Sequence, residues 1–259
     1  MILEEIVAKK RDEVAARQKK IPLRAWVEAI APLPPTRDFA AALNREIAII
    51  AEFKRRSPSH GLLQKELDPA KIALLYERNG AAAISVLTDE TFFGGSDSDI
   101  AAVKNAVRLP VLRKEFIIDP YQIVETRAIG ADAILLIASI LGREELRDYR
   151  RQAESLGLAA LVEVHSREEL FAALASGARL IGVNNRNLRT LATDIRVSLE
   201  LAPLIPPELT AVSESGIATK HDIEALHKAG FGAFLIGGAL LSSPDSGAKL
   251  RELAGAGEA

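Results

Sequence analysis

The sequence of 259 residues contains no cysteine, which excludes disulfide bonds, thiolate metal sites and a cysteine nucleophile. It also lacks a long apolar run, since the stretches 133–138 and 233–241 fall far short of the roughly 20 residues that cross a membrane. Basic and acidic side chains number 33 and 35, so no positive excess favours a nucleic-acid backbone. We therefore expect neither a membrane nor a nucleic acid as a partner.

What is present is the composition of a globular protein. Hydrophobic residues form 48% of the chain and charged residues 26%, which allows a large buried core. The amino-terminal residues mix Glu4 and Glu5 with Lys9 and Lys10 and contain no uninterrupted apolar segment, so they do not look like an export signal. We expect a cytoplasmic protein. The histidines show no metal-ligand spacing, and we expect no bound metal.

The amino-terminal part of the chain differs from the rest. Apolar residues recur with the helical period over 2–19, which predicts an amphipathic helix, and Pro22 ends it. A second short helix is predicted over 23–30. We interpret 1–45 as an N-terminal helical extension and 46–259 as a single catalytic domain.

Beyond the extension, short apolar runs alternate with longer amphipathic segments. Eight runs rich in Ile, Val, Leu and Ala predict strands at 47–54, 82–88, 110–116, 131–137, 159–164, 180–185, 210–215 and 233–237. The segments between them predict helices, among them 69–79, 121–129, 143–156, 167–176 and 220–229. Because continuous apolar strands joined by crossover helices form a parallel sheet covered by helices, the sequence predicts an α/β protein.

The number of units selects the architecture. Eight units of about 27 residues suit a closed (β/α)8 TIM barrel. A doubly wound open sheet is the alternative, but the glycine-rich turn expected after its first strand is replaced here by the segment 52–56, Glu-Phe-Lys-Arg-Arg. We therefore predict a (β/α)8 TIM barrel with an N-terminal helical extension.

Five of the predicted strands end in polar side chains, at the rim where such a barrel carries its active site. These side chains are Glu52 and Lys54, Lys114, Glu163, Asn184 and Arg186, and Glu214. A strand that leaves the core also becomes polar for no functional reason. This simpler interpretation suits Arg113, Glu115, Asn185 and Arg189.

The simpler interpretation does not suit Lys114 and Glu163, because apolar residues flank each of them within a predicted buried strand. An uncompensated charge at such a position is costly. A lysine and a carboxylate that share one pocket compensate each other and shift each other's pKa. The pattern therefore predicts general acid–base catalysis.

Small residues follow the last two predicted strands. Ser215-Gly216 and Gly237-Gly238 stand where backbone amides can approach an anion, which predicts a phosphate site, although tight turns alone would explain a single pair. Two loops, 57–61 and 92–96, are suited to close over a ligand. The candidates for an apolar wall against an aromatic ring are Phe93, Phe116, Leu135 and Leu188.

These residues stand in segments that together resemble the indole-3-glycerol-phosphate synthase family over nearly the whole chain. The matching segments are 50–61, 84–88, 92–96, 111–117, 130–137, 161–165, 181–188 and 214–217. The resemblance implies a (β/α)8 barrel of tryptophan biosynthesis that acts on one small-molecule partner, a sugar phosphate. The barrel would convert 1-(2-carboxyphenylamino)-1-deoxyribulose 5-phosphate to indole-3-glycerol phosphate, with loss of carbon dioxide and water and without a cofactor.

The same resemblance implies a role for each residue of the rim. Lys114 is the acid for the oxyanion formed during ring closure, Glu163 or Lys54 is the second acid, and Glu52 is the base. Substrate-binding residues are Asn184, Arg186 and Glu214, and the implied phosphate contacts are Lys54, Ser57, Ser215, Gly216, Gly237 and Gly238. Position 238 is commonly Ser or Glu in the family, so the glycine at this position removes a side-chain contact.

Two other functions stay open from the sequence alone. An isomerase or aldol-cleaving enzyme on a related phosphate-binding barrel shares the fold, although Glu52, Lys54, Lys114 and Glu163 as a set argue against it. A non-catalytic sugar-phosphate-binding protein or barrel scaffold is compatible with the same residues. A self-contained barrel also leads us to expect a monomer.

Overall fold

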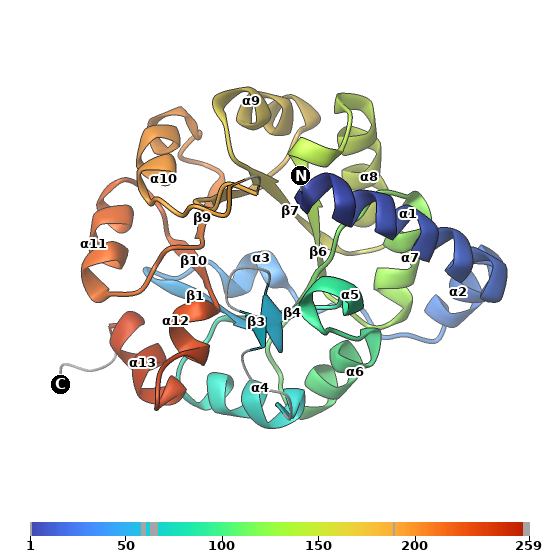
Figure 1. Cartoon of the computed structure of the whole chain (residues 1–259), viewed down its shortest axis with the longest axis horizontal. Helices are drawn as coiled ribbons and strands as arrows, with labels where there is room; N and C mark the ends of the chain where they lie inside the picture. The colour runs from blue at the N-terminus through green and yellow to red at the C-terminus, as the bar shows by residue number, and fades with distance from the viewer. Residues whose placement is uncertain (1, 58–60, 63–66, 189, 256–259) are drawn as a thin grey trace.

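The computed structural model describes residues 2–57, 61–62, 67–188 and 190–255, apart from the side chains of residues 57, 61 and 62. Eight parallel strands close into a barrel in the order β1-β10-β9-β8-β7-β6-β5-β4, as Figure 1 shows. They are β1 (Ala48–Phe53), β4 (Ala83–Leu87), β5 (Val111–Lys114), β6 (Ala133–Ile137), β7 (Ala159–Val164), β8 (Leu180–Asn184), β9 (Thr210–Glu214) and β10 (Ala233–Ile236). The predicted barrel is confirmed. A short antiparallel pair, β2 (Arg56–Ser57) and β3 (Gly61–Leu62), follows β1.

Helices form a ring around the strands (Figure 1). The ring consists of α4 (Pro69–Arg78), α6 (Asp97–Ala106), α7 (Pro120–Ala128), α8 (Arg143–Ser155), α9 (Arg167–Ser176), α10 (Arg196–Leu201), α11 (Lys220–Lys228) and α13 (Ser246–Leu253). Side-chain caps fix where several of them begin: Asp68 accepts from the amides of Ala70 and Lys71, and Thr219 accepts from the amide of Asp222. Short helices α5 (Glu90–Phe93) and α12 (Gly238–Leu241) and 3-10 turns η1 (Ala138–Ile140) and η2 (Ala202–Leu204) lie between these elements. None of the helices within the described ranges is both long and apolar enough to cross a membrane.

The strands separate two hydrophobic cores because successive side chains point to opposite faces of a strand. Outward residues such as Ile49 and Phe53 pack against the surrounding helices, whereas inward residues such as Ile50 and Leu161 fill the barrel. Two residues beyond an inward position, a side chain again points inward, now at the carboxyl end of the strand. The polar side chains at the strand ends follow inward apolar residues or glycines by two positions. Alternation therefore points these polar side chains toward the axis of the barrel, where they meet.

Three helices precede β1, namely α1 (Ile2–Lys20), α2 (Leu23–Ile30) and α3 (Phe39–Ala42). Phe39 is buried in the same cluster as the inward residues of the strands, and Ile6 of α1 joins that cluster. Lys10 is 2% exposed and lies 2.9 Å from an Asp89 carboxylate oxygen and 3.1 Å from a Glu115 carboxylate oxygen. Buried ion pairs therefore fix α1 to the loops at the carboxyl ends of β4 and β5.

The interpretation of Arg113, Glu115 and Asn185 as residues at which the strand simply becomes exposed is wrong, because all three are buried. Arg113 points outward from β5 beneath α7 and donates to a carboxylate of Glu125 at 2.8 Å. The helices that follow cover the outward side chains at the strand ends. A polar side chain at such a position is therefore buried and needs hydrogen-bond partners within the protein. Arg189 lies outside the described residues.

Candidate active site

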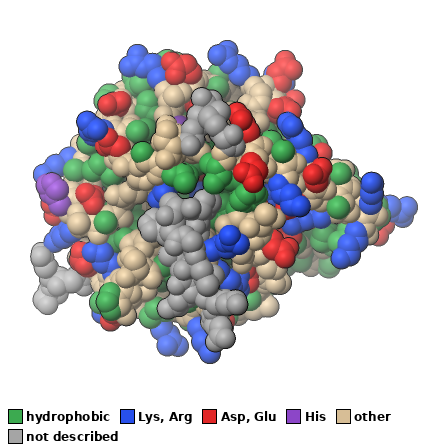
Figure 2. Space-filling view, viewed as in Figure 1, with side chains coloured by type: hydrophobic (Ala, Val, Ile, Leu, Met, Phe, Trp, Pro, Cys, Tyr) green, Lys and Arg blue, Asp and Glu red, His purple; other side chains and the backbone are tan. Residues whose placement is uncertain are grey.

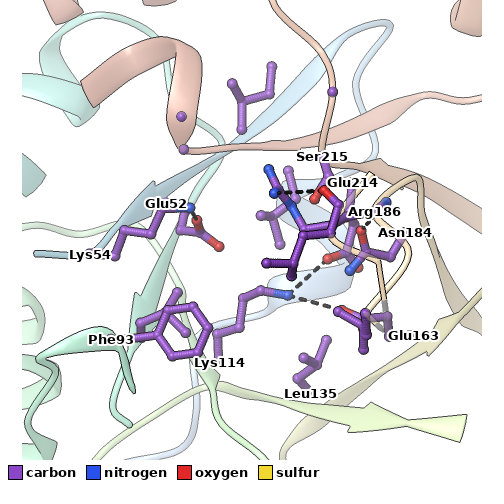
Figure 3. A pocket seen from close by; sticks show the side chains of 18 of the residues that line it. Glu52, Lys54, Phe93, Lys114, Leu135, Glu163, Asn184, Arg186, Glu214 and Ser215 are labelled. Carbon is purple, nitrogen blue, oxygen red and sulfur yellow. Dashed lines mark hydrogen bonds and ion pairs between the residues drawn. The ribbon is translucent and has the colours of Figure 1, made fainter. Parts of the chain in front are cut away.

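A pocket of about 400 Å³ opens at the carboxyl ends of the barrel strands. Its lining includes the residues predicted from sequence, namely Glu52, Lys54, Phe93, Lys114, Phe116, Leu135, Glu163, Asn184, Arg186, Leu188, Glu214, Ser215, Gly216, Gly237 and Gly238. Ser57 has its backbone in β2, and its side chain lies outside the described part of the chain. The structure thus gathers side chains from β1, β5, β7, β8 and β9 at one mouth (Figure 3), and their individual roles stay predictions.

Lys114 is the centre of the polar part of the pocket (Figure 3). Its Nζ atom lies 3.1 Å from Glu163 Oε2 and 3.0 Å from Glu214 Oε2. Burial alone would lower the pKa of Lys114, but the carboxylates of Glu163, Glu214 and Glu52 outweigh burial and raise the pKa above its ordinary value. The lysine is therefore an ammonium at neutral pH, aimed into the cavity by the carboxylates on either side.

The two carboxylates beside Lys114 have different environments. Burial would raise the pKa of Glu163, but Lys114 and His165 overcome burial and hold the pKa well below its usual range. Burial raises the pKa of Glu214 and the charge of Glu163 adds to this, while Lys114 offsets only part of the rise. Glu214 Oε1 is buried without a hydrogen-bond partner among the described residues. Glu163 is thus the stable anion of the pair, and Glu214 is the carboxyl that accepts a proton more readily.

Glycine at position 182 makes room for Glu214. Gly182 is on β8 and pairs with Glu163 of β7, and a Cβ atom on it would collide with Glu214 Oε1. The sequence analysis did not single out this glycine. A glycine inside an otherwise branched apolar strand is a usable signal, since it often marks the close approach of another group.

A second ion pair lies on the β1 side of the pocket (Figure 3). Lys54 Nζ donates to Glu52 Oε1, and Glu52 is almost fully buried. Glu52 packs on the backbone of Gly237, where a Cβ atom would come within 2.9 Å of the Glu52 Cβ atom and collide with its carboxylate. A carboxylate and a lysine therefore lie side by side, next to the turn that leads from β10 into α12.

Asn184 and Arg186 extend β8 into the pocket. Asn184 Oδ1 accepts from the Arg186 amide at 3.0 Å, which fixes the turn at the strand end. Arg186 also bridges to Thr193 and donates from Nη1 to the Leu191 carbonyl oxygen at 3.4 Å. The guanidinium is thereby held at the mouth, with Asn184 below it.

The predicted phosphate segments lie at the same mouth. Ser215 and Gly216 both have positive φ, at 66° and 77°, so the backbone after β9 turns sharply. Gly237 and Gly238 form the turn into α12 and line the pocket with their backbone. Gly238 has open space where a Cβ atom would stand. These two turns present backbone amides where an anion can be held between strands β9 and β10.

Apolar side chains form the remaining wall. The rings of Phe93 and Phe116 pack with centroids 6.1 Å apart, and Leu135 lines the same pocket. Helix α1 of the N-terminal extension adds Ile2, Leu3 and Ile6 to the pocket. Figure 2 shows hydrophobic side chains near the centre of this face and charges of both signs around its edge. The wall suits a flat aromatic ring.

His165 is a further residue that the sequence analysis passed over. It directly follows β7, two positions after Glu163, and its Nε2 atom lies 3.3 Å from Glu163 Oε1. Across the described residues, no group of three or more His, Asp and Glu side chains has an arrangement that would hold a metal ion. The site that results contains ammonium groups, carboxylates, backbone amides and an apolar wall.

Fold and site together define the class: an enzyme on a (β/α)8 barrel whose mouth gathers lysines and carboxylates beside backbone amides. The sequence model of the family described as indole-3-glycerol phosphate synthase matches residues 3–253. The chain belongs to the indole-3-glycerol phosphate synthase family. This family consists of ring-closing, decarboxylating lyases of tryptophan biosynthesis.

Individual relatives cover almost the whole chain. The indole-3-glycerol phosphate synthase of Carboxydothermus hydrogenoformans is 48% identical over 98% of this chain and 99% of its own length. That of Dehalococcoides mccartyi strain CBDB1 is 47% identical over 98% of this chain and 100% of its own. That of Chlorobium luteolum is 50% identical over 94% of each chain. A solved structure, the thiamine phosphate pyrophosphorylase of Pyrococcus furiosus, superposes with a TM-score of 0.59 at 16% identity, covering 82% of this chain and 95% of that one, and shares the fold.

Proposed function

We propose that this pocket converts 1-(2-carboxyphenylamino)-1-deoxyribulose 5-phosphate to indole-3-glycerol phosphate. The observation that carries the proposal is the Lys114 ammonium, held by Glu163 and Glu214 between an apolar wall and two amide-bearing turns. The substrate has the matching parts: an aromatic ring for the wall, a carbonyl group for the ammonium and a phosphate for the turns. A non-catalytic binding protein would need no such partly buried proton donor.

Ring closure comes first in the proposed sequence. The ring carbon that bears the carboxylate forms a bond to the carbonyl carbon of the ribulose chain, and the carbonyl oxygen becomes negatively charged. Lys114 Nζ donates a proton to this oxygen, which becomes a hydroxyl group. The bond to the carboxylate then breaks, carbon dioxide leaves, and its electron pair restores the aromatic ring.

Dehydration follows and needs an acid for the departing hydroxyl group and a base for the proton. We assign the acid to Lys54 and the base to Glu52. Glu163 does not suit the acid, because Lys114 and His165 keep its pKa low and its carboxylate ionised. Lys54 and Glu52 already form an ion pair at the mouth, so both partners of a proton exchange stand together. The role of Glu163 is then to position Lys114 and to favour its protonated form.

The remaining residues bind the substrate in this proposal. Ser215, Gly216, Gly237 and Gly238 hold the phosphate through backbone amides, with Lys54 supplying positive charge nearby. Asn184, Arg186 and Glu214 contact the hydroxyl groups of the sugar and the departing carboxylate. Phe93, Phe116, Leu135 and Leu188 pack against the aromatic ring, and Ser57 is the further phosphate contact expected from the family.

We also propose that the enzyme acts as a cytoplasmic monomer without nucleic-acid partners. In support, side chains of a single chain form the mouth, the wall and the ion pairs described above. The near balance of 33 basic and 35 acidic side chains leaves no large positive field for nucleic acid. Sedimentation of the purified protein would test the first point, and a stable dimer would overturn it.

The test of the proposed function is product formation by the purified protein, followed through indole fluorescence. An isomerase or an aldol-cleaving enzyme would consume sugar phosphates without forming an indole, and a binding protein would bind without turnover. The assignment of the second acid is tested with Lys54→Met and Glu163→Gln, with Lys249→Met as a lysine control remote from the site. We expect Lys54→Met to accumulate the decarboxylated, ring-closed alcohol. Accumulation in Glu163→Gln alone would transfer the role to Glu163.

A further inference from the structure

The mechanism above uses one oxygen of Glu163 and leaves the other. Glu163 Oε2 contacts Lys114 Nζ at 3.1 Å, while Oε1 lies 3.3 Å from His165 Nε2. On the far side of the imidazole, His165 Nδ1 lies 3.1 Å from Glu169 Oε2, near the amino end of α9. Four side chains therefore lie in series from the surface of the barrel to the ammonium in the pocket: Glu169, His165, Glu163 and Lys114. The link between His165 and Glu163 is an ion-pair contact and not a hydrogen bond, since His165 Nε2 has no hydrogen-bond partner among the described residues.

Glu169 is fixed by more than the imidazole. Its Oε2 atom accepts from the backbone amide of His165 at 2.7 Å, and its own amide donates to Ser166 Oγ, the cap of α9. The Glu169 carboxylate therefore contacts His165 twice, at its backbone amide and at its imidazole ring. Glu163 is 2% exposed, so its carboxylate has few other ways to be held in place.

We propose that His165 is a positioning residue, which holds the Glu163 carboxylate ionised and oriented so that Glu163 keeps Lys114 charged and aimed at the substrate. His165 lines no part of the pocket in the described residues, so it acts through Glu163 and not on the substrate. The inference rests on the proposed function, since it assigns to His165 a part in the same reaction.

The surroundings of His165 favour a charged imidazole. The carboxylates that contact the ring are Glu163 of β7 and Glu169 of α9. Among the other elements packed on β7, strands β6 and β8 and turn η1 carry no charged side chain, and α8 pairs Arg150 with its own Glu154. Burial alone would lower the pKa of His165, but Glu163 and Glu169 raise it to about 10. The other charged groups nearby, Lys114 and Glu214, lie on the side of Glu163 that faces away from His165, where Lys114 contacts both carboxylates.

The alternative is a histidine that only stabilises the turn between β7 and α9. Such a role would alter the melting temperature and leave the pH dependence of turnover in place. A role through Glu163 predicts that its carboxyl gains a proton at higher pH when the imidazolium is removed. The low-pH limb of the kcat profile is therefore the readout that separates the two roles.

The experiment compares wild type, His165→Gln, Glu163→Gln and the double variant. His227→Gln, at an exposed position of helix α11, is the histidine control. We expect His165→Gln to lower kcat by about tenfold, less than the 10²–10⁴ typical of a direct acid or base, with KM changed less than about threefold. Its low-pH limb should move to higher pH, and adding it to Glu163→Gln should cost little further activity.

A folded His165→Gln variant with wild-type kcat and an unmoved low-pH limb would overturn the inference, as would full additivity with Glu163→Gln. If His165→Gln fails to fold, Glu169→Gln takes its place, because the amide oxygen of glutamine still accepts from the His165 amide. It should shift the same limb in the same direction by a smaller amount, and an unmoved limb would again refute the role. Absence of product from the wild-type protein would refute the proposed function itself, which keeps the two failures distinct.

Discussion

Two clusters of buried charge lie on opposite faces of β5 and differ in how completely they are satisfied. On the outward face, Arg113 uses all its nitrogens as donors: Nε to Thr88, Nη1 to Gln122 and Thr126, and Nη2 to Asp97 and Glu125. On the inward face, the neighbouring residue Lys114 lies between Glu163 and Glu214, and Glu214 Oε1 has no hydrogen-bond partner in the described part of the chain. One network is complete and the other is open toward a cavity.

The difference separates stability from chemistry. In a complete network every polar group already has a partner, so no group is left for a ligand. Such a network stabilises the packing of β5 against α6 and α7. An incomplete network beside a cavity leaves polar atoms for a substrate to satisfy, and it keeps a proton donor accessible. Adjacent residues of one strand should therefore respond to mutation in opposite ways.

Replacing the inward residue should give the largest effect on turnover. Lys114→Met removes the group that we propose as the proton donor for ring closure, and we expect kcat to fall by about 10³-fold or more. The fold should persist, because Glu163 or Glu214 can take up a proton when the cation is lost. Steady-state assay with circular dichroism as the folding control checks this. Near wild-type turnover would remove Lys114 from the reaction.

Replacing the outward neighbour should affect stability instead. Arg113→Met leaves the buried carboxylate of Glu125 without its main partner, and breaking a buried pair of this kind costs about 3–5 kcal/mol. Arg17 still reaches Glu125 at 3.1 Å, which limits the loss. We expect a clear drop in melting temperature with kcat within about threefold of wild type at a temperature where the variant is folded. A large loss of kcat in the folded variant would contradict the division between the two faces.

The fold was predictable because its signals are local. Eight apolar runs and their spacing predicted the strands, and the structure places each strand within a residue or two of its predicted ends. The inward direction of Lys114 also follows from alternation, since Leu112 two residues earlier fills the barrel. Alternation equally sends Arg113 outward, but the sequence carries no sign that α7 covers it with Glu125.

Long-range contacts explain what the sequence did not show. His165 directly follows β7 and contacts Glu163 near the end of that strand, but its second partner, Glu169, reaches it only once α9 folds back on β7. Gly182 matters because the carboxylate of Glu214 approaches from the next strand. The apolar residues of α1 reach the pocket with Lys10 docked between Asp89 and Glu115, about 80 and 105 positions further along the chain.

The pH dependence of stability should distinguish the open cluster from the complete one. The folded state raises the pKa of Glu214 to about 7 from 4.5, so the folded protein binds more protons than the unfolded chain between these values. Its contribution to stability therefore falls as the pH rises through this window. The glutamine in Glu214→Gln does not titrate. We therefore expect the free energy of unfolding of this variant, relative to wild type, to increase by about 1–3 kcal/mol from pH 5 to pH 8. If the melting temperatures of wild type and Glu214→Gln change in parallel with pH, the raised pKa of Glu214 is refuted.

The smallest effect should come from the phosphate side of the open cluster, where two adjacent glycines differ. Gly238 has open space at its Cβ position and lacks positive φ, so Gly238→Ser fits and adds a hydroxyl donor beside the proposed phosphate site. One hydrogen bond is worth about 0.5–1.5 kcal/mol, and we expect KM to fall by roughly two- to tenfold at unchanged kcat. Gly237→Ser is the matched control, because its Cβ atom would displace Glu52 and lower kcat instead. An unchanged KM in Gly238→Ser would place the phosphate away from this turn, whereas equal effects at both positions would show that the turn, and not the added hydroxyl, determines affinity.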